Sequence, residues 1–366
     1  MLIQALPPVP VQLPPLPAHI RPYSPATAAD VPPAVDRLQL SALPAGLLKP
    51  PSILFPGQPV APPAPAPPAL VPPAQGTVSG KVSLDLLSLN VYALPKPVGK
   101  NIAQRSAVIG STLGRYDIAA LQETFSGDTR AIGETLSATF AGPNWQTFRP
   151  ENRFLGTSGL QIFSRYPIIA KDFKPFRYAS DEDALAKKGV AFTRIQVPGI
   201  GPVDVYDTHY QANGDDPLPW HEKALRKVAS LVQPGLTMTH DAIRRHDNQI
   251  MAELVKKHDQ GYPTFILGDF NASDKSQIVP ELIQQLGLKD SFRELHPDDP
   301  GFSSDGVLNP IKGGKSRSRL DYVLYRPGKD VDVRPVLSEL AYNKPGEYVS
   351  DHFGVHTRFE LSKKSA

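Results

Sequence analysis

An acid and an amide stand two residues apart at the end of an apolar stretch, FILGDFN at 265–271. The run is long enough for a buried strand, and it ends at Asp269 and Asn271. Because side chains alternate faces along a strand, these two could project together from its C-terminal end, where functional groups gather in layered α/β folds. A carboxylate beside an amide suits a hard divalent cation or a phosphate oxygen. An Asx turn that closes the strand is the alternative, and this stretch alone does not decide between them.

Polar residues of the same kinds end or begin several other apolar runs. They are Asn90, Glu123 after DIAALQ, His209 at the end of VDVYDTH, Asp321 in RLDYVL, and Asp351 and His352 before the last apolar run. Each one has a structural alternative, such as a turn amide, an acid at a helix start or a hydrogen-bonded structural histidine. Their common position at the ends of apolar runs favours one shared site over a series of coincidences.

The elements that would position these residues can be predicted from hydrophobic periodicity. Four helices are expected at 102–113, 129–139, 240–258 and 278–286, with Gly114 and Gly287 as stop signals for the first and last. Strands are expected at 82–92, 117–122, 145–148, 158–164, 168–173, 190–197, 203–208, 265–271, 320–325, 331–337 and 353–359. Residues 213–238 predict a long loop. Strands that are apolar on both faces, mixed with helices, predict an α/β fold (α+β in some schemes): a four-layer sandwich of two packed mixed β-sheets flanked by helices.

Proline divides the chain into two parts. Residues 1–80 hold 22 of the 41 prolines, and proline removes a backbone donor and fixes φ, so a disordered, partly polyproline-II arm is expected there. The arm is either a spacer or a docking segment for a Pro-rich-motif-binding partner, through 7–10 or 14–17. Residues 81–366 are expected to form a single catalytic domain.

Composition excludes some classes of function. The chain has no cysteine, so disulfides and thiolate metal sites are excluded. The formal net charge is +3, and residues 81–366, with 36 basic and 34 acidic residues, carry +2, which gives no broad electrostatic surface for nucleic acid. No apolar run approaches about 18 residues, so we expect no transmembrane helix. The first residues lack the basic segment of a secretory signal, and bacterial export and cytoplasmic residence both remain open.

The ordered set of polar strand ends resembles the endonuclease/exonuclease/phosphatase superfamily, the fold of pancreatic-type deoxyribonuclease, abasic-site endonucleases, inositol polyphosphate phosphatases and neutral sphingomyelinases. The matching strings are SLNVY (88–92), LQETF (121–125), SGLQIFSRYP (158–167), DTHYQA (207–212), GDFNAS (268–273), SRLDYVL (318–324) and SDHFGV (350–355). LQETF, DTHYQA and KKGVAFTRI (187–195) are most similar to the neutral sphingomyelinase-like branch.

The resemblance implies a role for each position. The implied catalytic residues are His209, Asp269, Asn271, Asp321 and His352. The implied metal-site residues are Glu123 as principal ligand, with Asn90 and Asp351, for Mg²⁺ or, as an alternative, Mn²⁺. His209 and Asn271 are also expected to bind the phosphate. The flexible basic segment 312–319 adds Lys315 and Arg317 as candidate substrate-binding residues.

We therefore expect a Mg²⁺-dependent phosphodiesterase of the sphingomyelinase or phospholipase C type, acting on a phospholipid headgroup. The basic segment keeps a metal-dependent nuclease acting on DNA or RNA as an alternative. A non-catalytic scaffold that acts through the Pro-rich arm is a further alternative. Trp220 is a candidate for peripheral membrane contact, with packing under a long loop as the other reading.

Overall fold

The computed structural model describes residues 80–95, 98–140, 144–152, 156–180, 183, 186–212 and 238–365. Of the predicted arm, only Gly80 is among these residues, and of the predicted 213–238 loop, only Met238 is. Trp220 lies outside the described residues.

Two six-stranded mixed β-sheets form the centre of the fold. The order in the first sheet is β15 (Val331–Ala341), β16 (Gly354–Lys363), β1 (Lys81–Asn90), β2 (Ile118–Gln122), β6 (Gln161–Ser164) and β3 (Gln146–Phe148). The order in the second is β11 (Lys289–Asp290), β14 (Asp321–Arg326), β10 (Thr264–Asp269), β9 (Gly201–His209), β8 (Gly189–Val197) and β7 (Ile168–Pro175). Each sheet has one parallel pair at its centre, β1–β2 and β9–β10, and its other pairs are antiparallel.

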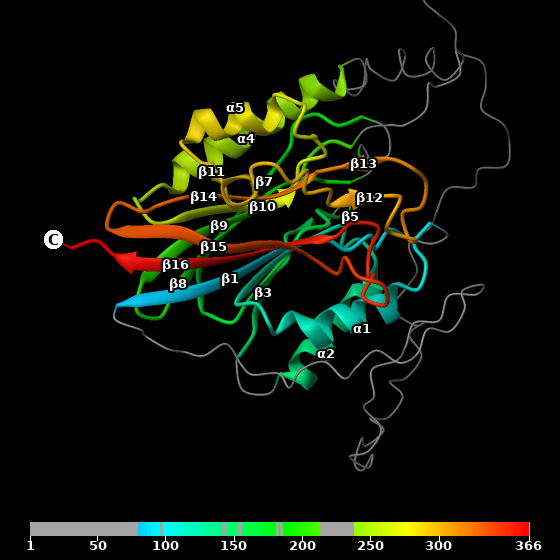
Figure 1. The fold of residues 1–366 in the computed structure, drawn as a ribbon, viewed down its shortest axis with the longest axis horizontal. Helices are drawn as coiled ribbons and strands as arrows, with labels where there is room; N and C mark the ends of the chain where they lie inside the picture. The colour runs from blue at the N-terminus through cyan, green and yellow to red at the C-terminus, as the bar shows by residue number, and fades with distance from the viewer. Residues whose placement is uncertain are drawn as a thin grey trace, which may run out of the picture. The chain divides into compact units, whose positions relative to one another are not determined.

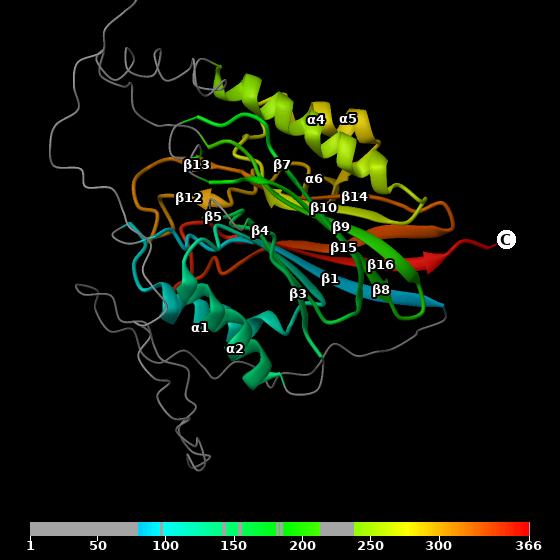
Figure 2. The ribbon, with the colours of Figure 1, turned by 180° about the vertical axis from the view of Figure 1, so that it is seen from behind.

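Helices cover the outer face of both sheets, as Figures 1 and 2 show. α1 (Ile102–Leu113) and α2 (Arg130–Thr139) pack on the first sheet, and α4 (His240–His258) and α5 (Ile278–Leu286) pack on the second. The predicted four-layer sandwich is therefore confirmed. Among the described helices, none is both long and apolar enough to span a membrane.

Most predicted elements are confirmed, with shifts at their ends. The predicted strand 158–164 begins only at Gln161, because Gly159 turns the chain with φ +73°. The last two strands run four residues further than predicted, to Ala341 and Lys363. The remaining pieces are too short to carry a periodic signal: η1 (Gly127–Thr129), α6 (Ser291–Leu295) and the two-residue pairs β4 (Glu151–Asn152) with β5 (Gly156–Thr157) and β12 (Ser304–Asp305) with β13 (Arg317–Ser318).

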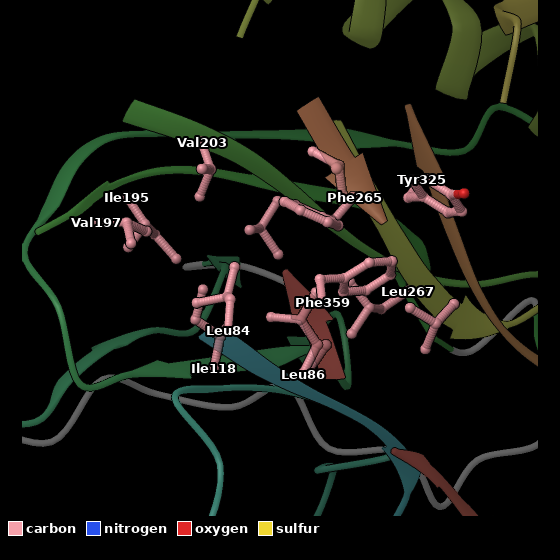
Figure 3. Packing of buried hydrophobic residues seen from close by; sticks show 14 of the residues in the cluster. Leu84, Leu86, Ile118, Ile195, Val197, Val203, Phe265, Leu267, Tyr325 and Phe359 are labelled. Carbon is pink, nitrogen blue, oxygen red and sulfur yellow. The ribbon is translucent and has the colours of Figure 1, made fainter. Parts of the chain in front are cut away.

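The space between the sheets is apolar along most of its length and polar at one end. Alternate residues of each strand fill the apolar part, among them Leu84 and Leu86 from β1 and Phe265 and Leu267 from β10 (Figure 3). The same inward-facing rows then continue into polar residues. These are Ser88 and Asn90 on β1, Gln122 on β2, Asp207 and His209 on β9, Asp269 on β10 and Asp321 on β14. Since side chains repeat every two residues along a strand, the strands that build the core also aim the polar residues.

A buried polar pair joins the two sheets directly beneath this polar end. Gln122 Nε2 donates to Asp207 Oδ1 at 2.7 Å. The other Asp207 oxygen, Oδ2, has no hydrogen-bond partner in the described part of the chain. Burial raises the pKa of the Asp207 carboxyl well above its usual value, because the charged form loses its hydration.

This pKa shift predicts a pH-dependent stability for the Asp207→Asn variant. The wild-type chain keeps this proton when folded but releases it on unfolding, so its free energy of unfolding should fall as pH rises above about 4, by at most about 1.4 kcal/mol per pH unit. The variant has a neutral amide at every pH and should gain stability over wild type as pH rises. Urea unfolding at pH 5 and pH 8 measures the difference, with the exposed Asp298→Asn as the control. A difference between variant and wild type that is the same at both pH values would contradict the prediction.

Candidate active site

The side-chain amide of Asn90 joins a carboxylate from each sheet. Its Nδ2 donates to Glu123 Oε1 at 2.9 Å and to Asp269 Oδ2 at 3.0 Å. Its Oδ1 accepts the backbone N–H of Tyr92 at 3.0 Å, which fixes the orientation of the amide. Three sequence-predicted residues from three strand ends therefore meet at one point, in the polar end of the space between the sheets.

Glu123 stands in a strained backbone position directly after β2. Its φ is +57°, and its carbonyl accepts the backbone N–H of Ala93 at 3.1 Å. Its Oε2 is buried without a partner among the described residues. Burial and the nearby negative charge of Asp351 raise the pKa of Glu123 to about 7. A buried carboxylate with an unpaired oxygen and a second negative charge nearby is an arrangement that a divalent cation would stabilise.

Asn271 joins the site, but not in the way that the alternation rule predicted. β10 ends at Asp269, whose Oδ1 accepts the backbone N–H of Asn271 at 2.9 Å in an Asx turn, and Asn271 has φ +47°. The prediction that both side chains project from the strand was wrong in this respect, because the turn rotates the second residue out of the pleat. Asn271 Nδ2 instead donates to the carbonyl of Tyr210 at 3.1 Å, beside His209. The two residues that form the Asx turn, Asp269 and Asn271, are therefore also residues of the candidate site.

A close approach of backbones makes this arrangement possible. Asp269 and His209 are paired residues of the parallel strands β10 and β9. Gly268 lies against the carbonyl of Thr208, and an added Cβ would overlap that oxygen. Glycine is therefore required at this position to keep the two functional side chains on neighbouring strand ends.

His352 and Asp321 form a buried hydrogen-bonded dyad, as predicted. His352 Nδ1 lies 2.8 Å from Asp321 Oδ2 and 3.8 Å from Asp269 Oδ2. Burial alone would lower the pKa of His352, but these two carboxylates outweigh it and raise the pKa well above its usual value. Asp269, Asp321 and His352 offer ligand atoms within 4.8 Å of one another, so this group could also hold a metal ion. The Nδ1 atom of His352 is already bound to Asp321, so Nε2 is the ring nitrogen that is left for another partner.

His209 is kept neutral by its surroundings. Its Nε2 lies 3.0 Å from Lys188 Nζ and 3.6 Å from Asp269 Oδ2. Burial and the charge of Lys188 lower the pKa of His209 to about 3. Because an ammonium group only donates, Nε2 accepts from Lys188 and the ring proton is on Nδ1.

Lys188 is a site residue that sequence analysis did not select. It is buried, and its Nζ binds Asp183 Oδ1 at 2.7 Å and the carbonyl of Tyr210 at 3.1 Å as well as His209. Lys188 belongs to the string KKGVAFTRI, in which the adjacent Lys187 is only half-buried, and nothing in the string separates the two lysines. The signal that could have identified it is its place immediately before a strand that is buried on both faces.

Arg105 is a second residue that the sequence did not indicate. It is buried at the start of α1, and its guanidinium donates to the carbonyls of Val91 (2.7 Å), Tyr92 (2.6 Å), Val349 (2.8 Å) and Lys100 (3.1 Å). It thus connects the segment after β1 with the segment that leads to Asp351. An arginine within an amphipathic helix pattern is ordinarily a solvated residue, which is why periodicity gave no sign of this role.

Of the remaining candidates, Lys315 lies between β12 and β13, and Arg317 is the first residue of β13. Arg317 Nε donates to Asp305 Oδ2 at 2.9 Å, and its guanidinium lies over the ring of Phe302. Lys315 is exposed on the same segment. Arg317 therefore contacts Asp305 and Phe302 rather than the buried cluster.

Two packed mixed sheets with carboxylates, amides and histidines at one end define a hydrolase-type site. The chain belongs to the Endonuclease/Exonuclease/phosphatase family, whose model matches residues 87–352. Members of this family are hydrolases that act on phosphoester bonds, and the predicted superfamily is thereby confirmed.

Relatives with known names point to one branch of the family. A sphingomyelinase of Mycobacterium bovis is 25% identical over 287 residues, which are 75% of this chain and 52% of that protein. A sphingomyelinase of Dictyostelium discoideum is 34% identical over 120 residues, 28% of this chain and 25% of the relative. The chain thus spans about half the length of the mycobacterial relative and matches a quarter of the other. These relatives support the predicted sphingomyelinase-like branch.

Solved structures share the fold. Sphingomyelinase C from Streptomyces griseocarneus has a TM-score of 0.54 at 20% identity, covering 76% of this chain and 99% of that one. D. rerio TDP2 complexed with single strand DNA product has a TM-score of 0.58 at 17% identity, covering 76% and 98%. At these identities the likeness shows the architecture and leaves the substrate open.

Proposed function

We propose that this chain is a divalent-metal-dependent phosphodiesterase that cleaves the headgroup of a phospholipid of the sphingomyelin class. The observation that carries the proposal is the convergence on Asn90 of carboxylates from both sheets, with His352 and His209 on either side of Asp269. A phosphodiester needs such a mixture, because negative charge develops on its oxygens during hydrolysis.

The chemistry of the donor set fits a magnesium ion at Glu123 and Asp351. Glu123 Oε2 is a buried oxygen without a partner in the described chain, and burial and the negative charge of Asp351 raise the pKa of Glu123 to about 7. Magnesium prefers few carboxylates and keeps several waters, so this pair would suffice as protein ligands. Asn90 would support the site by donating from Nδ2 to Glu123 Oε1, since its own Oδ1 is used by the Tyr92 N–H. When bound, the ion would neutralise charge on the phosphoryl oxygens. The buried group of Asp269, Asp321 and His352 is better explained as proton-transfer machinery, because its histidine nitrogen is used by Asp321.

In its neutral form, the His352–Asp321 dyad would take the proton of the attacking water through Nε2, so turnover should rise with pH as the raised pKa of His352 is passed. Asp321 holds Nδ1 and stabilises the imidazolium that forms, in the way that a triad carboxylate orients its histidine. Asp269 lies between His352 and His209 and would align water and phosphate between them. His209, with the buried Lys188 ammonium, would serve the leaving side, and the Asn271 amide lies beside it.

The lipid is favoured as the substrate because the named sequence relatives are sphingomyelinases. A nuclease is the second candidate, since the basic segment 312–319 could bind a phosphate backbone and a fold neighbour is bound to DNA. A non-catalytic scaffold is disfavoured because a decayed site would be expected to lose at least one member of the cluster.

The substrate class is decided by a paired assay in one buffer containing Mg²⁺. We expect release of phosphocholine from sphingomyelin liposomes and no nicking of supercoiled plasmid. Nicking without phosphocholine release would replace the lipid proposal by the nuclease. Absence of metal-dependent hydrolysis of any diester, including bis-p-nitrophenyl phosphate, would favour the scaffold.

Removing the proposed base should abolish turnover and leave the fold intact. In His352→Ala we expect turnover of bis-p-nitrophenyl phosphate to fall by about 10² to 10⁴. The variant should still fold, with a lower melting temperature, because Asp269 and Asp321 lose the positive group that accompanies them. His356 provides a matched control: it is equally buried four residues away, but it is bound to Asp85 and Glu339 on the outer face of the sheet. His356→Gln should therefore keep its turnover while losing stability. Near-normal turnover in His352→Ala would show that the dyad is not the base.

Metal binding should depend on Glu123. We expect a chelator to abolish hydrolysis and Mg²⁺ or Mn²⁺ to restore it. We also expect Glu123→Gln to bind Mn²⁺ at least about tenfold more weakly in calorimetry or electron paramagnetic resonance. Glu134→Gln, an exposed change on α2, is the control and should bind as wild type does. Unchanged Mn²⁺ affinity in Glu123→Gln would move the metal site elsewhere.

A further inference from the structure

Exposed aliphatic side chains gather at the end of the sandwich that holds the polar cluster. Val307 and Leu308 are 59% and 54% exposed and adjacent in sequence. They belong to the segment that follows β12 and ends at the first residue of β13, here called the 306–317 loop. Val98, 55% exposed, follows β1. Figures 1 and 2 show β12 and β13 at the end where β1 finishes and β16 begins. The other two strongly exposed aliphatic residues of the described chain, Ile169 and Val336, lie on β7 and β15.

The fold itself holds the aliphatic pair in solvent. Asp305 Oδ1 accepts the backbone N–H groups of Val307 at 2.9 Å and Leu308 at 3.1 Å. The Asp305 carbonyl accepts the N–H of Asn309, and Gly306 N–H donates to the carbonyl of Ser316. Asp305 is itself buried and held by the guanidinium of Arg317. A backbone with this many fixed groups presents its side chains in a defined direction.

The loop and its flanks are bonded to the backbone of the catalytic dyad. Asn309 Nδ2 donates at 2.8 Å to the carbonyl of Ser350, two residues before His352. Ser303, just before β12, accepts the backbone N–H of Asp321 on its Oγ at 3.1 Å. Its carbonyl accepts the N–H of Phe353 at 2.7 Å. These hydrogen bonds fix the position of the 306–317 loop relative to the dyad. A surface that binds the loop would therefore lie at a fixed position relative to His352 and Asp321.

The charge of the loop is positive. Residues 306–317 contain three basic residues and no acidic one. Lys315 is exposed, Lys312 is partly exposed, and no ion pair joins either to an acid within the described ranges. Aliphatic side chains between lysines match the interface of a bilayer, where the aliphatic groups enter the acyl boundary and the ammonium groups meet headgroup phosphates. A nucleic acid would engage the lysines but would gain nothing from the exposed aliphatic pair.

We propose that the 306–317 loop docks on a phospholipid bilayer, with Val307 and Leu308 entering the interface and Lys312 and Lys315 contacting anionic headgroups. Docking of this kind would bring a lipid headgroup to the polar end of the sandwich without reshaping the dyad. The inference rests on the proposed lipid substrate and adds the surface by which the protein reaches it.

The test uses the full chain and sucrose-loaded vesicles of sphingomyelin, phosphatidylcholine and phosphatidylserine. We expect the double variant Val307→Ser/Leu308→Ser to bind these vesicles at least about tenfold more weakly than wild type and to lose vesicle hydrolysis in proportion. Its turnover of soluble bis-p-nitrophenyl phosphate should stay unchanged. Ile169→Ser is the matched control, a 53% exposed aliphatic residue on β7, and should bind vesicles as wild type does. Lys312→Gln/Lys315→Gln should weaken binding by about fivefold per charge when phosphatidylserine is present, and less without it.

The outcomes separate this inference from the proposed function. Equal vesicle binding by wild type and the Val307→Ser/Leu308→Ser variant overturns the docking surface. So does a lysine effect that is seen with a single-stranded oligonucleotide and not with vesicles. If neither the wild type nor any variant hydrolyses a diester, but vesicle binding still depends on Val307 and Leu308, the docking surface stands and the proposed enzymatic function fails.

Discussion

The arrangement of the whole site depends on one hydrogen-bonded amide, that of Asn90. Both hydrogens of its Nδ2 are used by carboxylates that come from opposite sheets, and its oxygen is used by a backbone N–H. This geometry exists only if the carboxyl ends of two parallel pairs, β1–β2 and β9–β10, face each other across the core. The packing of aliphatic rows between the sheets sets that alignment, and the cluster is the polar continuation of the same rows.

Electrostatic balance explains why this cluster is poised for a cation. Burying carboxylates is costly unless positive groups accompany them. His352 lies beside Asp269 and Asp321, and Lys188 forms an ion pair with Asp183. Glu123 has less compensation, and its pKa is raised to about 7 by burial and by the negative charge of Asp351. The buried Arg105 guanidinium offsets part of that negative charge from a distance, while it binds the segment after β1 and the segment that leads to Asp351.

The sequence was sufficient to predict the two sheets, their helices and seven of the polar residues at one end, because strand periodicity and strand ends are local signals. The position of Asn271 was wrong in detail because an Asx turn and a left-handed residue follow Asp269, and alternation cannot anticipate where a strand stops. Lys188 and Arg105 were not found because their importance arises from tertiary contacts. A lysine pair before a strand and an arginine within a helix look the same in sequence whether they are solvated or buried.

Rigidity connects the chemistry to the docking surface. The side chains of Ser303 and Asn309 are hydrogen-bonded to the backbone at Asp321 and near His352. The same short segment exposes Val307 and Leu308 to solvent. A flexible loop could contact a bilayer in many orientations, each with a different distance from headgroup to dyad. A loop whose backbone is held by Asp305 and by the dyad's own strands would limit those orientations, so the proposed contact with the bilayer would also set the approach of the phosphodiester. Because proximity and orientation supply much of the rate enhancement in such reactions, an exposed aliphatic pair can contribute to catalysis without touching the substrate's phosphate.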